Sequence, residues 1–185
     1  MIKRIFDILF SLFALIVFGV FILFFYIWAT IDNQSNGLFI QERIGQFGKI
    51  FRIFKIKSIK NNTTEISIFS KFLRKSKIDE LPQLWNVLIG NMSIVGPRPD
   101  IAGYYDKLEG ENRKILDLKP GLTSFASIKY ANEDEILSKH QNPLQYNDEI
   151  IFPDKVKMNL EYYHKQSILL DLQIIFKTIF RYNNF

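Results

Sequence analysis

The sequence contains no cysteine and only two histidines, His140 and His164, among its 185 residues. The absence of cysteine excludes a disulfide framework, a cysteine-ligated zinc site, an iron–sulfur cluster and a thiol nucleophile. Two imidazoles that are 24 positions apart also exclude a histidine-rich metal cage and argue against a Ser-His-Asp triad. The P-loop, G-x-G-x-x-G and H-E-x-x-H motifs are missing as well. Any chemistry must therefore rest on carboxylates, hydroxyls and basic groups.

The longest apolar run of the chain, residues 8–31, contains no charged side chain. As a helix, these 24 residues would be about 36 Å long, which suffices to cross a hydrocarbon core of about 30 Å. The run is too long for the apolar part of a signal peptide, and no A-x-A cleavage site follows it. We therefore expect a membrane-inserted helix at residues 1–31 and a separate domain at residues 32–185 that lies on the membrane surface.

Basic residues lie near both ends of this apolar run, namely Lys3, Arg4, Arg43, Lys49 and Arg52. Because positive residues favour the cytoplasmic side, this distribution favours both ends, and the domain that follows, on the cytoplasmic face. That topology requires a re-entrant helix that bends within the bilayer, and Gly19 lies near the middle of the run. A spanning helix is the alternative, since glycine is also common in plain transmembrane helices.

Charge is unevenly distributed along the rest of the chain. Residues 32–78 contain ten basic and three acidic side chains, a net charge of +7, whereas residues 79–154 contain seven basic and thirteen acidic ones, a net charge of −6. A solvated face is the simplest interpretation of a charge run. However, residues 66–75 combine apolar side chains at helical spacing with lysine and arginine, which predicts a basic amphipathic helix on an anionic membrane surface. We expect membrane lipid, and no nucleic acid, as a partner.

The hydrophobic patterns predict an α+β fold that is mainly helical, with short strands and amphipathic helices at the membrane interface. Residues 50–57 alternate basic and apolar side chains, as a half-buried strand does. Residues 81–88 repeat apolar side chains at helical spacing, and the N-cap of this predicted helix is Ser76 or Asp79.

The predicted helix ends at Gly90, and residues 92–100 predict a short strand that enters a Gly-Pro-Arg-Pro turn. The two prolines of that turn fix the backbone on either side of Arg98 and so orient its guanidinium. Residues 119–123 predict another turn. Two further helices are predicted at residues 155–165 and 167–180.

Two adjacent carboxylates, Asp79 and Glu80, are the strongest candidates for chemistry. Carboxylates that begin a helix are usually capping residues, and this is the simpler interpretation. The alternative rests on charge, because helix N–H groups and nearby cations keep a carboxylate ionised and also attract phosphate. An ionised Asp79 can attack phosphorus, with Glu80 accepting a proton or orienting a partner. A divalent metal, typically Mg²⁺, would bridge Asp79 and the phosphate oxygens.

The string KIDELPQLWNVLIGNMSIVGPRPD, residues 77–100, closely resembles a signature of the bacterial sugar transferases, the small monotopic phosphoglycosyl transferases. That signature reads S-L-D-E-L-P-Q-L-x-N-V-L-x-G-x-M-S-x-V-G-P-R-P. Shorter matches extend the resemblance over nearly the whole chain. They are K-R-x-x-D at 3–7, Q-x-R-x-G at 41–45, F-x-x-x-K at 51–55, a match to R-P-G-I-T at 119–123 and S-x-x-L-D at 167–171.

The resemblance implies a reaction in two steps at the cytoplasmic face of the bacterial inner membrane. A UDP-sugar gives its sugar-1-phosphate to an aspartate and releases UMP, and a polyprenyl phosphate, usually undecaprenyl phosphate, then accepts the sugar-1-phosphate. This would be the first membrane step of surface glycan synthesis. Carried onto matching positions, Asp79 is the nucleophile and the Mg²⁺ ligand, and Glu80 is its partner. The residues that would hold phosphates are Arg98, Arg74 and Lys55.

The chain departs from the family pattern at three places. Gly19-Val20 stands where the membrane helix of the family bends at a Ser-Pro pair. Ala131 replaces an arginine, with Lys129 as the substitute phosphate-binding charge, and Asn159 takes a commonly acidic position. We expect these differences to affect sugar and nucleotide recognition.

Two other functions are compatible with the sequence. One is a non-catalytic membrane-surface module that is related to these enzymes and binds lipid phosphate or a partner enzyme. The other is a soluble phosphate-binding enzyme with a plain anchor. The sequence leaves the sugar, the glycan pathway and the oligomeric state open.

Overall fold

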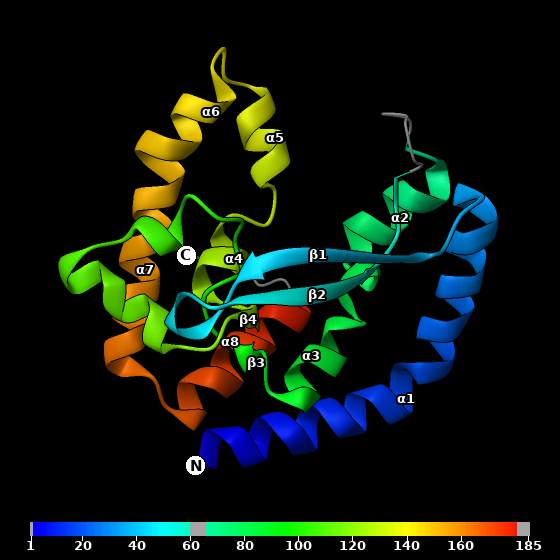
Figure 1. Cartoon of the computed structure of the whole chain (residues 1–185), viewed down its shortest axis with the longest axis horizontal. Coiled ribbons are helices and arrows are strands. Elements are labelled where there is room, and N and C mark those ends of the chain that lie inside the picture. Colours follow the sequence, from blue (N-terminus) through cyan, green and yellow to red (C-terminus); the bar gives the residue numbers. More distant parts are fainter. Residues whose placement is uncertain (1, 60–65, 181–185) are drawn as a thin grey trace. The chain divides into compact units, whose positions relative to one another are not determined.

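The computed structural model describes residues 2–59 and 66–180 of the chain. They belong to two compact units, one of Met1–Arg43 and Ile50–Met92, the other of Ile44–Lys49 and Ser93–Phe185. Most of the labelled elements in Figure 1 are helices, and the strands are few and short. The predicted class, a mainly helical α+β fold with a long apolar N-terminal helix, is confirmed. The domain boundary expected between residues 31 and 32 stays a prediction.

Helix α1 (Ile2–Asn33) contains the apolar run and begins six residues before it. Within residues 2–59 and 66–180, it is the one helix that is long and apolar enough to cross a membrane, by length and composition. Its buried residues lie toward its two ends, whereas Ile16 and Val20 near its middle are 72% and 76% exposed. The protein itself therefore leaves the middle of α1 uncovered, as expected of a segment that meets lipid.

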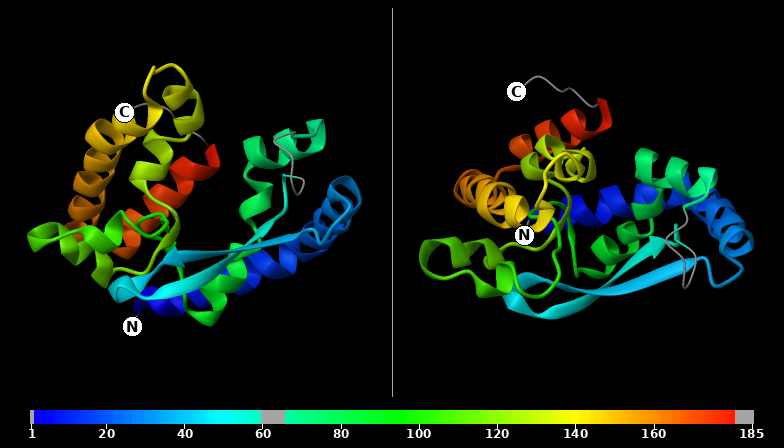
Figure 2. Two further views of the ribbon diagram at one scale, coloured as in Figure 1. Left: turned by 45° about the horizontal axis from the view of Figure 1, so that its top comes forward. Right: turned by 90° about the horizontal axis from the view of Figure 1, so that it is seen from above.

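Both ends of α1 contact other elements of the first unit. Near its start, the Arg4 guanidinium donates to the carbonyl oxygens of Val87 and Leu88, at 2.6 and 2.8 Å. At its end, the Asn33 amide donates to the carbonyl oxygen of Lys57, at 3.1 Å. Figures 1 and 2 show that α1 is bent, with its second half turned away from the direction of its first half. The bend brings both ends of the apolar run back to one unit.

A two-stranded sheet and helix α2 follow α1 in the first unit. The strands are β1 (Leu38–Ile44) and β2 (Ile50–Ile56), and the helix is α2 (Ile68–Ser76). The strand expected at residues 50–57 is thus confirmed. The core of this part consists of Ala29, Ile56 and Leu73.

The N-terminus of α2 is capped and linked to the end of α1. The Ser67 hydroxyl accepts from the backbone N–H of Ser70 and donates to the Asp32 carboxylate. On the surface of α2, Ile68 and Phe72 are exposed together with basic side chains. The helix therefore has the amphipathic surface that the sequence predicts, and its contact with a membrane stays a prediction.

Helix α3 (Gln83–Ile89) follows a short 3₁₀ turn, η2 (Ile78–Glu80). The predicted end at Gly90 is confirmed, because Gly90 adopts the left-handed conformation with φ of 95° that glycine tolerates at a helix C-terminus. The predicted N-cap is wrong. Ser76 ends α2, where its hydroxyl donates to the Phe72 carbonyl oxygen, and Pro82 is the residue that precedes α3. Asp79 lies inside η2 and caps neither element.

The second unit contains a parallel strand pair and most of the short helices. The strands are β3 (Ser93–Val95) and β4 (Gly121–Thr123), and the helical elements are η1 (Gln46–Gly48), η3 (Tyr105–Lys107), η4 (Gly110–Asp117), α4 (Phe125–Lys129), α5 (Glu133–Ser138), α6 (Pro143–Tyr146), η5 (Asn147–Ile151), α7 (Phe152–Lys165) and α8 (Ile168–Phe180). The two C-terminal helices, seen from two more directions in Figure 2, lie where the sequence predicts them.

Residues 119–123 are more than the turn expected from the sequence, since Gly121–Thr123 form strand β4, with Ser93 opposite Gly121 and Val95 opposite Thr123. The pairing depends on close backbone approach. A Cβ atom on Gly121 would lie 2.1 Å from the backbone nitrogen of Gly96. Only the lack of a side chain at this position lets the strand that leads into the Gly-Pro-Arg-Pro turn pack so closely.

Buried side chains from several elements make up the core of the second unit: Ile44, Tyr105, Ile115, Leu116 and Val156. Asn159, at the position noted as commonly acidic, is also buried, and its amide donates to the Tyr105 hydroxyl at 2.9 Å. In this chain Asn159 therefore has a partner within the core.

Candidate functional site

Asp79 and Glu80 are both buried, and each residue as a whole, backbone included, has 8% of its surface exposed. Their position follows from local backbone geometry, because Lys77 ends α2 in the left-handed conformation with φ of 58° and so directs the chain into η2. Burying a carboxylate is costly unless it is paired or hydrogen-bonded, since the interior solvates charge poorly. Two buried carboxylates side by side therefore need a specific reason to be there.

Glu80 has a counter-ion from a distant part of the first unit. Strand β2 presents Lys55, whose Nζ lies 3.3 Å from Oε1 of Glu80. Both side chains are largely withdrawn from water, with exposed fractions of 19% for Lys55 and 10% for Glu80. Glu80 is thus held beside strand β2 by a partly buried ion pair.

Asp79 differs from Glu80, because its Oδ1 is buried and has no hydrogen-bond partner in the protein. A buried acceptor left in this state costs about 1–3 kcal/mol. Neither helix capping nor a structural ion pair accounts for this atom. The interpretation that Asp79 serves to cap a helix is therefore wrong, and a role toward a bound group remains.

The charges around Asp79 act in opposite directions. Burial is the main cause that raises the pKa of Asp79 above its ordinary value, and the Glu80 carboxylate raises this pKa further. Three cations lower the same pKa, namely Lys55, Lys77 and Arg74. The first unit therefore brings four of the predicted site residues into one electrostatic environment: Asp79, Glu80, Lys55 and Arg74.

Two residues near Asp79 were not singled out from the sequence. Lys77 acts on the pKa of Asp79, and its place two residues away in a basic stretch was a usable signal. Gln83, the first residue of α3, is 3% exposed, and its Nε2 has no hydrogen-bond partner. The sequence shows Gln83 within the D-E-L-P-Q string, but it does not show that the side chain is buried.

The other two predicted phosphate-binding residues, Arg98 and Lys129, belong to the second unit. Arg98 follows the Gly96-Pro97 step, where the Gly96 N–H donates to the Thr123 carbonyl oxygen at 3.0 Å. Lys129, at the end of α4, has a protein partner, because its Nζ lies 2.7 Å from Oδ2 of Asp154. Phosphate binding by either residue stays a prediction.

Asp79 fits the chemistry of a divalent-cation ligand. Mg²⁺ prefers oxygen ligands, typically one or two carboxylates together with substrate phosphates, and the buried Oδ1 of Asp79 is such an oxygen. Within residues 2–59 and 66–180, no group of three or more histidine, cysteine, aspartate or glutamate side chains is arranged to hold a metal. A metal at Asp79 would therefore depend on phosphate oxygens of a substrate for much of its coordination.

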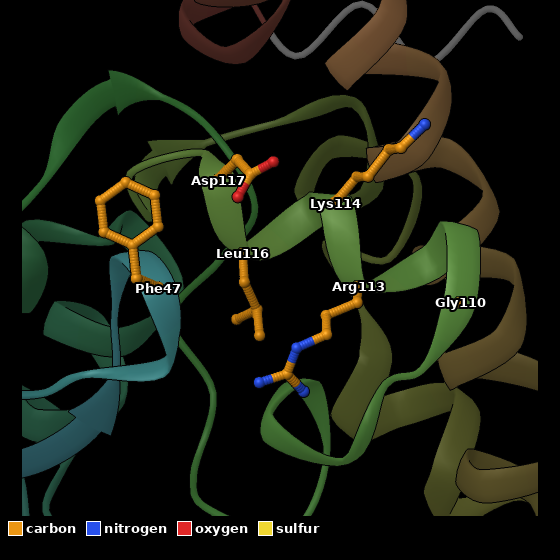
Figure 3. Close-up of a pocket in the computed structure, with 6 residues that line it drawn as sticks. All are labelled: Phe47, Gly110, Arg113, Lys114, Leu116 and Asp117. Atoms are coloured by element: carbon orange, nitrogen blue, oxygen red, sulfur yellow. The ribbon is translucent and has the colours of Figure 1, made fainter.

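A surface pocket of about 350 Å³ lies in the second unit (Figure 3). It is lined by Phe47, Gly110, Arg113, Lys114, Leu116 and Asp117. None of the site residues predicted from the sequence lines this pocket. We therefore assign it no part in the chemistry of Asp79.

Comparison with known proteins identifies relatives of this chain. The family model described as bacterial sugar transferase matches residues 1–184. The galactosyl transferase CpsE of Streptococcus agalactiae serotype III (strain NEM316) is 30% identical over 96% of this chain and 41% of its own length. The exopolysaccharide production protein PSS of Rhizobium leguminosarum bv. phaseoli is 30% identical over 96% of this chain and 92% of its own length.

A third relative is the UDP-glucose:undecaprenyl-phosphate glucose-1-phosphate transferase of Klebsiella pneumoniae, 32% identical over 97% of this chain and 39% of its own length. The chain thus spans only about two fifths of the length of two of these three relatives. The match to the family model nevertheless covers almost every residue of this chain. The chain therefore belongs to the bacterial sugar transferase family.

Proposed function

We propose that this chain transfers a sugar-1-phosphate from a UDP-sugar to a polyprenyl phosphate, such as undecaprenyl phosphate, through a covalent intermediate on Asp79. Family membership and the name of the Klebsiella relative support the general reaction. The observation that carries the proposal is the buried Oδ1 of Asp79, which no group of the protein satisfies. A nucleophile needs an oxygen that is not committed to a protein partner, and Oδ1 of Asp79 has no such partner.

In the first step, a carboxylate oxygen of Asp79 forms a bond to the phosphorus that carries the sugar. The bond from that phosphorus to the bridging oxygen breaks, and UMP leaves with the electron pair. In the second step, an oxygen of polyprenyl phosphate attacks the same phosphorus, and the Asp79 carboxylate is released. The product is a polyprenyl diphosphate sugar, and Asp79 returns to its starting state.

The cations around Asp79 fit this reaction. Lys55 and Arg74 lower the pKa of Asp79 and so favour the ionised, nucleophilic form. They also supply positive charge for the anionic phosphates. Glu80, paired with Lys55, orients that cation next to the nucleophile. Mg²⁺, held by Asp79 and substrate phosphates, would offset the repulsion between the carboxylate and the phosphates.

The membrane segment fits a lipid acceptor. The bend in α1, and the contacts of Arg4 and Asn33 with the first unit, support a re-entrant helix whose two ends lie on the same side of the bilayer. Basic residues at both ends favour the cytoplasmic side of the inner membrane. The polyprenyl chain would then remain in the bilayer while its phosphate reaches the protein at the surface.

The test uses the membrane-extracted full chain with Mg²⁺ and a panel of UDP-sugars that includes UDP-glucose and UDP-galactose. Without an acceptor, intact-mass spectrometry should show one added sugar phosphate, and UMP should be released in equal amount. Asp79→Asn should give neither, whereas Glu109→Gln, at an exposed carboxylate, should behave as the wild type. Product formation by Asp79→Asn would refute the nucleophile. A wild-type protein that releases no UMP from any sugar, yet binds polyprenyl phosphate, would favour the non-catalytic module.

A further inference from the structure

Helix α3 begins with a buried amide that the protein does not satisfy. Gln83 is 3% exposed, and its Nε2 lacks a hydrogen-bond partner. It follows Asp79 by four residues, across η2 and the first turn of α3, and Oδ1 of Asp79 is also without a partner. One segment of chain therefore holds a buried acceptor and a buried donor, each of which costs about 1–3 kcal/mol when unsatisfied.

A second amide on the same helix shows that this state is not forced by the fold. Asn86, three residues further along, is 0% exposed. Its Nδ2 donates to the Arg52 carbonyl oxygen at 2.7 Å, and its Oδ1 accepts from the Phe54 N–H at 3.2 Å. Asn86 thus ties α3 to strand β2 and has both of its polar atoms satisfied. By contrast, Nε2 of Gln83 forms no hydrogen bond that would link α3 to another part of the protein.

We propose that Nε2 of Gln83 donates a hydrogen bond to a non-bridging oxygen of the phosphoryl group that is transferred at Asp79. The inference rests on the proposed function and adds a catalytic residue to it. Phosphoryl oxygens are strong acceptors, and a fixed donor in a buried site stabilises the charge that they carry. The amide is neutral in every protonation state of the site, so it can sit near Asp79 without competing with substrate as a counter-ion. No proton is transferred in this contact.

The decisive variant is Gln83→Met, which keeps the length of the side chain and removes its donor. We expect it to slow formation of the sugar-phosphate adduct on Asp79 by about 100-fold or more, the usual effect of losing one donor to a developing oxyanion. The melting temperature of the substrate-free protein should stay equal or rise, because an unsatisfied buried group has been removed. Asn86→Leu is the matched control, and its melting temperature should fall, because it removes two satisfied hydrogen bonds.

The adduct is measured by quenched intact-mass spectrometry with UDP-glucose or UDP-galactose, whichever the wild type uses, and without an acceptor. An adduct rate equal to wild type in Gln83→Met would overturn the inference. So would a fall in melting temperature similar to that of Asn86→Leu, with a rate loss explained by unfolded protein. Gln83→Glu, which replaces the donor by a carboxylate, should be as slow as Gln83→Met. If the wild type itself forms no adduct, the proposed function fails, whatever the variants do.

Discussion

Nζ of Lys55 lies 3.3 Å from Oε1 of Glu80, although 25 residues separate them in the chain. The pair joins strand β2 to the turn that carries Asp79. Because Lys55 also lowers the pKa of Asp79, one cation serves both carboxylates. Strand β2 therefore contributes to the charge around Asp79 as well as to the fold of the first unit.

The rate of UMP release should fall at low pH, where Asp79 becomes protonated, and this part of the pH–rate profile is its acid limb. Lys55→Met should move the acid limb to higher pH. The substitution removes a cation that lowers the pKa of Asp79, so this pKa rises, and a higher pH is needed to ionise the carboxylate. UMP release measured from pH 5 to 9 reports the position of the limb, whatever the height of the plateau. Lys71→Met, at an exposed lysine on α2, is the control and should leave the limb unchanged. A limb that stays in place or moves to lower pH in Lys55→Met would contradict the role given to Lys55.

Asp79→Asn should be more stable than the wild type at neutral pH. Because the pKa of Asp79 is raised in the folded state, folding favours the protonated carboxyl. The resulting contribution to the free energy of unfolding is complete below the unfolded pKa, near 3.8, and is lost as the pH rises through the folded pKa. Asparagine stays neutral throughout, so the difference in melting temperature should shrink as the pH falls toward 4. The measurement is thermal unfolding in detergent with EDTA, and Glu109→Gln is the control. A less stable Asp79→Asn protein at pH 7 would contradict the account of Asp79 burial.

Lys129→Met tests whether Lys129 acts mainly on Asp154. The Lys129 hydrogen bond is the main cause that lowers the pKa of Asp154, so its stabilising effect is present above the unfolded pKa, near 3.8, and is lost as the pH falls through the lower folded value. Because both groups are partly exposed, the loss at pH 7 should be small, about 0.5 kcal/mol in the free energy of unfolding. We expect this loss to disappear at acid pH in urea titrations. A large rise in KM for UDP-sugar without any loss of stability would instead favour phosphate binding by Lys129.

Single cysteines can report the topology of α1, because the chain has none of its own. Ile2→Cys and Asn36→Cys place thiols at exposed positions on either side of the apolar run. With a re-entrant helix, both should react with a membrane-impermeant maleimide in inverted inner-membrane vesicles, and neither in intact spheroplasts. Val20→Cys, in the middle of α1, should react in neither preparation. If Ile2→Cys and Asn36→Cys react from opposite sides, α1 spans the membrane.

Much of the fold follows from local patterns in the sequence. The uncharged run at 8–31 lies within α1, and Gly90 ends α3 as predicted. The patterns failed where tertiary pairing decided the outcome. Residues 119–123 read as a turn because of Pro120 and Gly121, yet Gly121 is the residue that lets β4 pack against β3. A local pattern cannot reveal which backbone approaches a glycine.

The candidate site was also only partly predictable from the sequence. Its acidic pair is recognisable from the D-E-L-P-Q string alone, and so is the basic stretch that precedes it. From spacing alone, capping was the simpler interpretation of the pair, because carboxylates that begin a helix are usually capping residues. The structure excludes capping, because Asp79 caps neither η2 nor α3, and a catalytic role of Asp79 stays a proposal.

The sequence by itself determined the long apolar helix, the order of most helices and the identity of the acidic pair, since these depend on residues that are close together in the chain. The tertiary structure alone decided that Lys55 faces Glu80 and that Arg4 donates to carbonyl oxygens at the end of α3. It also decided that the amide nitrogen of Asn86 has a hydrogen-bond partner, whereas that of Gln83 has none. Such contacts join residues far apart in the chain. They depend on how whole helices and strands pack against one another, and the spacing of residues along the chain does not reveal that packing.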